Sequence, residues 1–106
     1  MSLLGIDVGT TGCKAAAFSE DGICLASAYR EYKILHPSPD LAELDSREVL
    51  SSVKTCIGEV AGKTRKNPIT ALSVSSLGEA MTPVSKDRKI LGNCILSSDI
   101  RGAEYV

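Results

Sequence analysis

The segment at residues 4–14, LGIDVGTTGCK, places a carboxylate inside an apolar run and follows it with glycines, threonines and a lysine. Burying an unpaired carboxylate is costly, so Asp7 requires water, hydrogen bonds, a cation or a metal nearby. The segment therefore predicts a polar site at the end of the first strand.

The turn after this strand contains groups that suit an anion. Gly9 allows the backbone amides of the turn to approach a ligand closely, and Thr10 and Thr11 add hydroxyl donors. Lys14 can reach a phosphate oxygen as a point charge, while the preceding carboxylate can hold a hydrated Mg²⁺. The spacing fits equally well a polar hairpin turn whose lysine lies in solvent.

The segment matches neither of the two familiar phosphate loops. It lacks the second glycine and the Lys-Ser/Thr ending of a Walker A loop, and it is not a G-x-G-x-x-G sequence. It also leads into a second apolar run instead of a helix. A strand, a tight turn and a returning strand therefore remain.

The elements that would position this turn follow an α/β order. Apolar runs at residues 3–8, 13–18 and 23–29 predict two antiparallel hairpins, the second with its turn at Asp21-Gly22. A helix is expected from an N-cap at Asp45 to about residue 64, because apolar residues recur there at helical spacing.

Further strands are expected after this helix. Residues 69–74 are rich in β-branched side chains, and residues 81–84 and 90–96 predict another hairpin or two short strands. Ser97-Ser98-Asp99 resembles a second helix cap, yet only the residues from Ile100 to Val106 follow it. We therefore expect the chain to be the amino-terminal part of a longer protein.

Composition limits the chain to one small domain or part of one, with 106 residues of which 43% are hydrophobic. The net charge of −1 gives no reason to expect nucleic acid, and no apolar run is long enough to span a membrane. We expect a cytoplasmic protein. The four cysteines are expected to be small buried thiols, because their wide spacing and the single histidine do not suit zinc.

Four segments resemble the FGGY carbohydrate kinases, which are members of the actin, Hsp70 and sugar kinase superfamily. LGIDVGTTGCKAAAFSEDG resembles their phosphate-binding hairpin, and DLAELDSRE, at residues 40–48, resembles the family's G-W-A-E-Q-D-P-E-E segment. ALSVSS, at residues 71–76, resembles the strand before the family's sugar-binding loop, and ILSSDIR, at residues 95–101, is similar to the W-x-D-x-R segment. The resemblance implies a ribonuclease H-like α/β fold with a mixed sheet and a flanking helix, in an incomplete domain.

The resemblance also implies a reaction, the ATP-dependent phosphorylation of a sugar or polyol hydroxyl. Asp7 matches the aspartate that helps hold Mg²⁺, and Gly9, Thr10, Thr11 and Lys14 match the residues around the transferred phosphate. Such a site works by positioning and charge neutralisation.

The substrate residues implied by the resemblance are Glu79, Asp99 and Arg101. Glu79 matches the glutamate of the glycerol-kinase-like Q-R-E loop; a solvated loop glutamate is the alternative. For Asp99 and Arg101 the alternative is a helix cap with a salt-bridged arginine. Leu77-Gly78 departs from both the glycerol kinase and the xylulokinase sequences at this loop, so the identity of the sugar stays open.

The resemblance places the catalytic base, an aspartate in the family, beyond Val106, and it places much of the nucleotide site on a second domain. We therefore expect the rest of the first domain and the second domain to lie outside this chain, and the chain alone to be inactive. Uncovered sheet edges predict its self-association, and a homodimer is a candidate state of the intact protein. The alternative is a nucleotide-driven switch or interaction module of the same superfamily.

Overall fold

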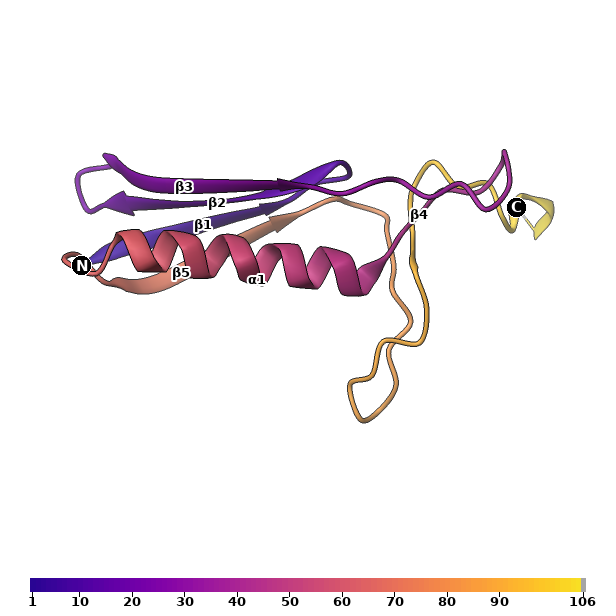
Figure 1. The fold of residues 1–106 in the computed structure, drawn as a ribbon. Helices are drawn as coiled ribbons and strands as arrows, with labels where there is room; N and C mark the ends of the chain where they lie inside the picture. Colours follow the sequence, from indigo (N-terminus) through magenta and orange to yellow (C-terminus); the bar gives the residue numbers. More distant parts are fainter. Residues whose placement is uncertain (106) are drawn as a thin grey trace.

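The computed structural model describes residues 1–105 and contains a four-stranded sheet with one long helix packed against it (Figure 1). The order of the strands in the sheet is β3-β2-β1-β5, and β4 and β6 form a second, two-stranded sheet. The strands are β1 (Ser2–Val8), β2 (Gly12–Ser19), β3 (Cys24–Glu31), β4 (Glu43–Leu44), β5 (Ile69–Ser76) and β6 (Cys94–Ile95); the helices are α1 (Ser46–Lys63) and the short 3-10 helix η1 (Ala103–Tyr105).

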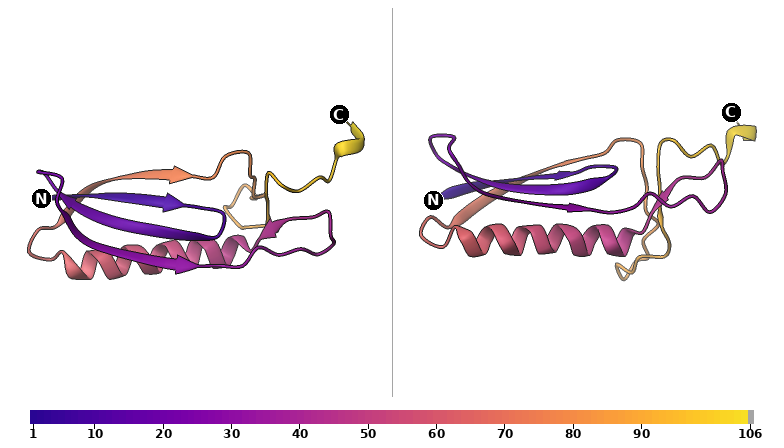
Figure 2. Two further views of the ribbon diagram at one scale, coloured as in Figure 1. Left: turned by 90° about the horizontal axis from the view of Figure 1, so that it is seen from above. Right: turned by 45° about the horizontal axis from the view of Figure 1, so that its top comes forward.

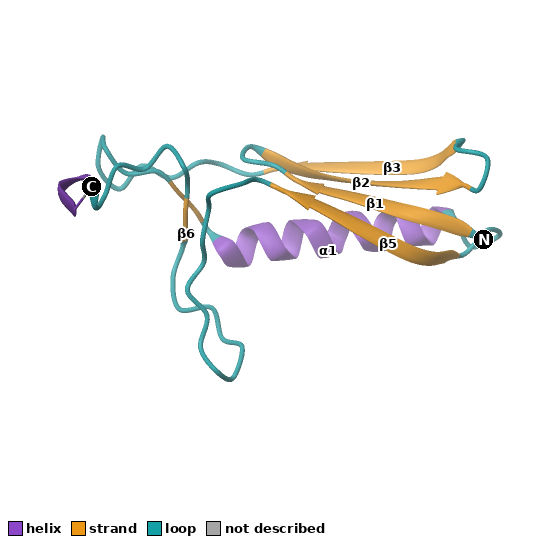
Figure 3. Ribbon diagram, turned by 180° about the vertical axis from the view of Figure 1, so that it is seen from behind, coloured by secondary structure: helices purple, strands orange, loops and turns teal. Residues whose placement is uncertain are grey.

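The main sheet is mixed, as expected from the sequence. β1, β2 and β3 pair antiparallel through two hairpins, whereas β5 pairs parallel to β1 after the crossover through α1. Figure 3 shows the sheet from the other side, with β5 at its outer edge. The two predicted hairpins, the predicted helix and the strand predicted at residues 69–74 are therefore confirmed.

Helix α1 begins where its cap was predicted. The side chain of Asp45 accepts hydrogen bonds from the amides of Arg47 (3.0 Å) and Glu48 (3.3 Å), which would otherwise lack partners at the helix start. The helix ends at Lys63, and the hydroxyl of Thr64 donates to the carbonyl of Val60.

The core lies between α1 and the β2 and β3 side of the sheet (Figure 2). Alanines on β2 and β3 let the helix approach the sheet closely, and burial of the apolar side chains stabilises the contact. The buried residues of this layer are Leu4, Ile6, Cys13, Ala15, Ala17, Ala28, Cys56 and Val60.

Strand β5 is left largely uncovered. Leu72 and Val74 pair with Leu4 and Ile6 of β1 and share their face of the sheet, yet 58% of Leu72 and 56% of Val74 is exposed. The helix does not reach them because it packs against β2 and β3. An apolar strip therefore runs along one edge of the sheet.

The expectation that all four cysteines are buried is wrong. Cys13 and Cys56 are buried, with their sulfurs 3.9 Å apart between β2 and α1, and burial raises the pKa of Cys13 to about 11. Cys94 is half-buried. Cys24 is exposed because it lies at the start of an edge strand, beside the hollow on the sheet face opposite α1.

The end of the chain also differs from the expectation. Residues 81–95 form a hairpin-like connection held by bridges at Met81–Ile95 and Val84–Ile90, with only β6 as a regular strand. Asp99 caps the amide of Arg101, but no α-helix follows within residues 100–105. Gly102 has a φ of +87°, which interrupts a right-handed helix, so only η1 forms.

Two expectations concern the limits of the chain. Val106, beyond which the catalytic base is expected, lies outside the described residues, so the position of that base stays a prediction. Among residues 1–105 no helix is long and apolar enough to cross a membrane.

Candidate active site

The turn between β1 and β2 presents free hydrogen-bond donors. The amide of Gly9 donates to the carbonyl of Gly12 over 2.9 Å, which closes the turn. Thr10 and Thr11 are exposed, and within residues 1–105 neither their amides nor their hydroxyls have a hydrogen-bond partner. These groups fit an anion such as a phosphate.

Asp7 and Lys14 lie opposite each other on β1 and β2, and Ser75 of β5 flanks Asp7 on its other side. Both charged residues are exposed and line a hollow of about 490 Å³ on the sheet face opposite α1. The carboxylate of Asp7 has no hydrogen-bond partner in the described part of the chain. A single free carboxylate suits Mg²⁺, which usually keeps several of its waters.

The end of β3 supports the turn from beside it. A methyl group built on Gly12 would overlap the hydroxyl of Tyr29, so only glycine fits there. Tyr32 bonds the turn through two hydrogen bonds, to Gly9 and Thr11. Sequence reasoning missed both tyrosines, because the contacts of Tyr32 span more than 20 residues and follow no local pattern.

The loop after β5 brings Glu79 to the same end of the sheet. The amide of Leu77 donates to the carbonyl of Val8 over 3.0 Å, so the loop leaves β5 beside the turn between β1 and β2. Glu79 is exposed, and its φ of +54° is a left-handed conformation that glycine adopts more easily. Residues other than glycine that are held in this conformation are often found at ligand-binding positions.

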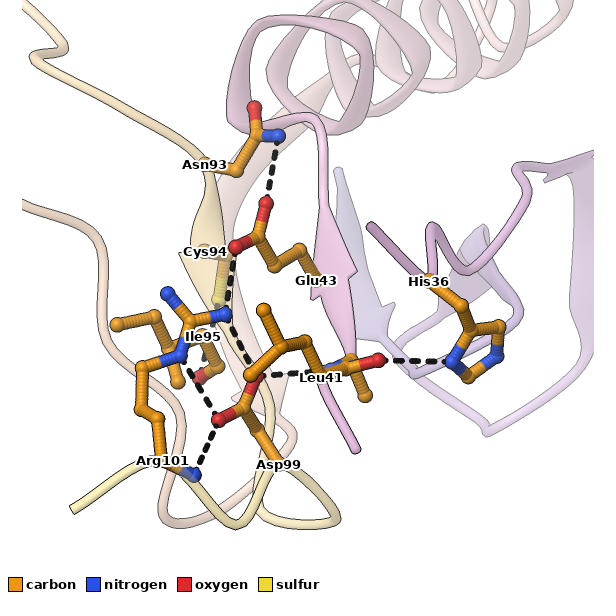
Figure 4. A network of polar contacts seen from close by, with 9 residues as sticks. His36, Leu41, Glu43, Asn93, Cys94, Ile95, Asp99 and Arg101 are labelled. Atoms are coloured by element: carbon orange, nitrogen blue, oxygen red, sulfur yellow. Dashed lines mark hydrogen bonds and ion pairs between the residues drawn. The ribbon is translucent and has the colours of Figure 1, made fainter. Parts of the chain in front are cut away.

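Asp99 and Arg101 form an internal network with β4 (Figure 4). Arg101 Nη2 lies 2.6 Å from Asp99 Oδ2 and 2.5 Å from Glu43 Oε2, and Asn93 donates to the other oxygen of Glu43 over 3.0 Å. Asp99 Oδ2 also accepts from the amide of Ala42 over 2.8 Å. The side chain of Asp99 is fully covered, whereas 37% of the Arg101 side chain is exposed.

These contacts shift the titration of the three charged groups. The hydrogen bonds from Arg101 hold the pKa of Asp99 well below its usual range, and hydrogen bonds from Arg101 and Asn93 lower the pKa of Glu43. The two carboxylates in turn raise the pKa of Arg101. The network therefore carries its charges at neutral pH and ties the segment after β6 to β4.

The structure thus gathers some of the expected site residues and separates others. Asp7, Thr10, Thr11 and Lys14 lie on one hairpin, and the loop with Glu79 starts beside it. Asp99 and Arg101 are connected to that loop only indirectly, through the Met81–Ile95 bridge, and their charged atoms are paired with each other and with β4.

Comparison with known proteins decides the family. Residues 2–106 match the sequence model described as "FGGY family of carbohydrate kinases, N-terminal domain". The chain belongs to the FGGY family of carbohydrate kinases. Its fold is accordingly that of the sugar kinases in the actin, Hsp70 and ribonuclease H-like group, as the sequence predicted.

Named relatives of this FGGY chain act on different compounds. It is 36% identical to the probable L-xylulose kinase of Haemophilus influenzae, with 97% of this chain and 22% of that protein covered. It is 30% identical to the glycerol kinase of Leptospira biflexa, with 92% and 21% covered. The crystal structure of gluconate kinase from Lactobacillus acidophilus matches with a TM-score of 0.85 and 26% identity, over 98% of this chain and 21% of that one. The FGGY chain spans about a fifth of the length of the relatives it matches.

Proposed function

We propose that the protein carrying this chain transfers the terminal phosphate of ATP to a hydroxyl group of a sugar or polyol, with Mg²⁺. The observation that carries the proposal is the turn between β1 and β2, where Thr10 and Thr11 leave amides and hydroxyls free beside the unpaired carboxylate of Asp7. Membership of a carbohydrate kinase family supports the same reaction.

Each residue of the hairpin has a distinct task in this proposal. Thr10 and Thr11 donate hydrogen bonds to phosphate oxygens, Gly9 lets the backbone approach them, and Lys14 neutralises negative charge. Asp7 holds the hydrated Mg²⁺, which when bound neutralises charge on the phosphates. The protein's own contribution is to keep these groups at fixed positions on two paired strands.

The substrate part of the proposal rests on the loop after β5. Glu79 would accept hydrogen bonds from substrate hydroxyls, since its carboxylate is exposed and has no partner among the described residues. Asp99 and Arg101 are proposed to contribute near the substrate, Arg101 through the exposed part of its side chain and Asp99 by holding Arg101 in place. The named relatives act on a ketose, a polyol and a sugar acid, so the proposal is limited to a polyhydroxylated substrate.

The proposal assigns only part of the kinase to this chain. We propose that residues 1–106 are the amino-terminal part of the first kinase domain, that the base aspartate lies beyond Val106 and the second domain outside this chain, and that the chain alone has no turnover. The small fraction of the relatives' length that the chain covers supports this division. A cytoplasmic location is part of the same proposal.

We also propose that the isolated chain self-associates through β5, while a homodimer is the state proposed for the intact protein. β5 is an edge strand of eight residues without charge or proline, and all of its residues except Ile69 are exposed. A long, uncharged edge offers unpaired backbone groups to another strand. Leu72 and Val74 add exposed apolar surface on one face.

The experiment for the proposed function measures ATP consumption by the whole gene product against pentoses, ketoses, polyols and sugar acids. Activity is expected with one substrate class, and Asp7→Ala should lower kcat by roughly 100-fold, the effect typical of losing a charge-stabilising group. Glu79→Ala should mainly raise the KM for the sugar. Asp21→Ala, in the exposed turn at the other end of the same sheet, is the matched control and should change neither.

The opposite result would be ATP binding or hydrolysis without dependence on any sugar. That result would favour a nucleotide-driven switch and remove the proposed task of Glu79.

A further inference from the structure

Tyr32 lies just after β3, and its ring is buried, with 6% of the residue exposed. Its hydroxyl donates to the carbonyl oxygen of Gly9 over 2.5 Å, and its backbone amide donates to the carbonyl of Thr11 over 3.1 Å. One residue therefore holds two carbonyls of the turn between β1 and β2.

These two bonds fix the direction of the peptide groups in the turn. In a trans peptide the carbonyl of one residue and the amide of the next point in opposite directions. Because the Gly9 carbonyl points at the hydroxyl of Tyr32, the amide of Thr10 points away from it. That amide has no acceptor among residues 1–105, so it is oriented outward and free.

The tyrosine hydroxyl suits this task over a wide pH range. Burial raises the pKa of Tyr32 to about 12, so the hydroxyl keeps its proton and remains a donor at physiological pH. This hydrogen bond also holds the Gly9 carbonyl oxygen toward Tyr32. Its partial negative charge therefore faces away from the side where an anion would bind. An aromatic ring without the hydroxyl would fill the same space but leave this carbonyl unpaired.

We infer that Tyr32 is a positioning residue that holds the Gly9–Thr10 peptide with its amide toward a nucleotide phosphate. This inference rests on the proposed phosphate-binding function of the turn. Tyr32 does not touch the phosphate; it acts through the peptide that does. Tyr29, three residues earlier on β3, gives a contrast, since its hydroxyl makes no hydrogen bond among the described residues and 53% of the residue is exposed.

The test compares Tyr32→Phe with the matched control Tyr29→Phe in the whole gene product. Loss of one neutral hydrogen bond that orients a donor should weaken binding of Mg·ATP about three- to tenfold, measured as Kd by calorimetry and as KM for ATP. The KM for the sugar should stay close to the wild-type value, and the thermal unfolding midpoint of the whole protein should fall by only a few degrees, the cost of one lost hydrogen bond. Tyr29→Phe should leave all four quantities unchanged.

Three results would overturn the inference. Equal Mg·ATP affinity in wild type and Tyr32→Phe would show that the hydroxyl does not position the turn. A parallel loss of ATP affinity, sugar affinity and thermal stability would show a general structural effect instead. A wild-type protein that binds Mg·ATP but phosphorylates no sugar would overturn the proposed kinase reaction, yet the Kd comparison would still decide about Tyr32. A wild-type protein that does not bind Mg·ATP would overturn both.

Discussion

Replacing Gly12 with alanine is the sharpest steric test of the hairpin formed by β1 and β2. An added Cβ would overlap the hydroxyl of Tyr29 and lie 2.6 Å from the carbonyl oxygen of Arg30. The ring of Tyr29 is half exposed and can swing aside, but the carbonyl belongs to the backbone of β3, which pairs with β2. The clash with Arg30 can be relieved only by moving one strand against the other.

Overpacking of this kind typically costs about 1–3 kcal/mol, and the backbone contact places Gly12→Ala in the middle or upper part of that range. We therefore expect the free energy of unfolding to fall by about 2 kcal/mol. For a domain of this size each kcal/mol lowers the melting temperature by about 4–8 °C, so a loss of roughly 10 °C is expected.

The assay is urea denaturation of the purified protein, with Gly5→Ala as the matched control. Gly5 lies on β1 of the same sheet, and the atom nearest to its added Cβ is 4.0 Å away, so this variant should differ from wild type by less than about 0.5 kcal/mol. If Gly12→Ala were as stable as Gly5→Ala, the inferred close contact between Gly12 and the backbone of β3 would be wrong. Adding Tyr29→Ala to Gly12→Ala should recover only part of the loss, because the Arg30 carbonyl remains.

Other parts of the chain give three further predictions. Glu79→Gly and its control Arg88→Gly should each stabilise the protein by about 0.5–1 kcal/mol in urea denaturation, because both residues have a positive φ that glycine adopts more easily. Only Glu79→Gly should also raise the KM for the sugar. Stability should fall below about pH 4, because the pKa of Asp99 is lowered in the folded state, so this carboxylate takes up its proton more readily in the unfolded state. Denaturation measured between about pH 3 and 7 should show this decline, and Arg101→Gln should reduce it. Val74→Lys should reduce self-association of the isolated chain in sedimentation, and an unchanged association state would exclude the β5 edge as the contact.

The elements that depend on local sequence could be predicted. The Asp21-Gly22 turn, the N-cap at Asp45 and the apolar periodicity of α1 are each encoded within a few residues. The same holds for the turn between β1 and β2, whose glycines and threonines are adjacent in the sequence. Strand limits shifted by one or two residues, because the ends of strands depend on their partners.

The features that could not be predicted join residues far apart in the sequence. β4 and β6 are two residues long and lie about 50 residues apart, so neither has a pattern of its own. The expected helix after Asp99 failed because Gly102 takes a left-handed conformation and the side chain of Arg101 is drawn to β4. The contact of Tyr32 with Gly9 likewise becomes visible only when β3 is placed beside the turn.

Hydrogen-bond satisfaction separates the expected site residues into two groups with different consequences. Asp7, Thr10 and Glu79 have polar side-chain groups without partners among residues 1–105, so a ligand can bind them without breaking an internal contact. Asp99 is fully covered and satisfied by Arg101 and a backbone amide, so a ligand could recruit it only by disrupting the network. Removing a partner from a satisfied buried group costs stability, whereas removing an unsatisfied exposed group costs mainly ligand affinity. Asp99→Asn should therefore lower the unfolding midpoint clearly while raising the KM for the sugar only slightly. Glu79→Gln should raise the KM for the sugar clearly while changing the unfolding midpoint only slightly.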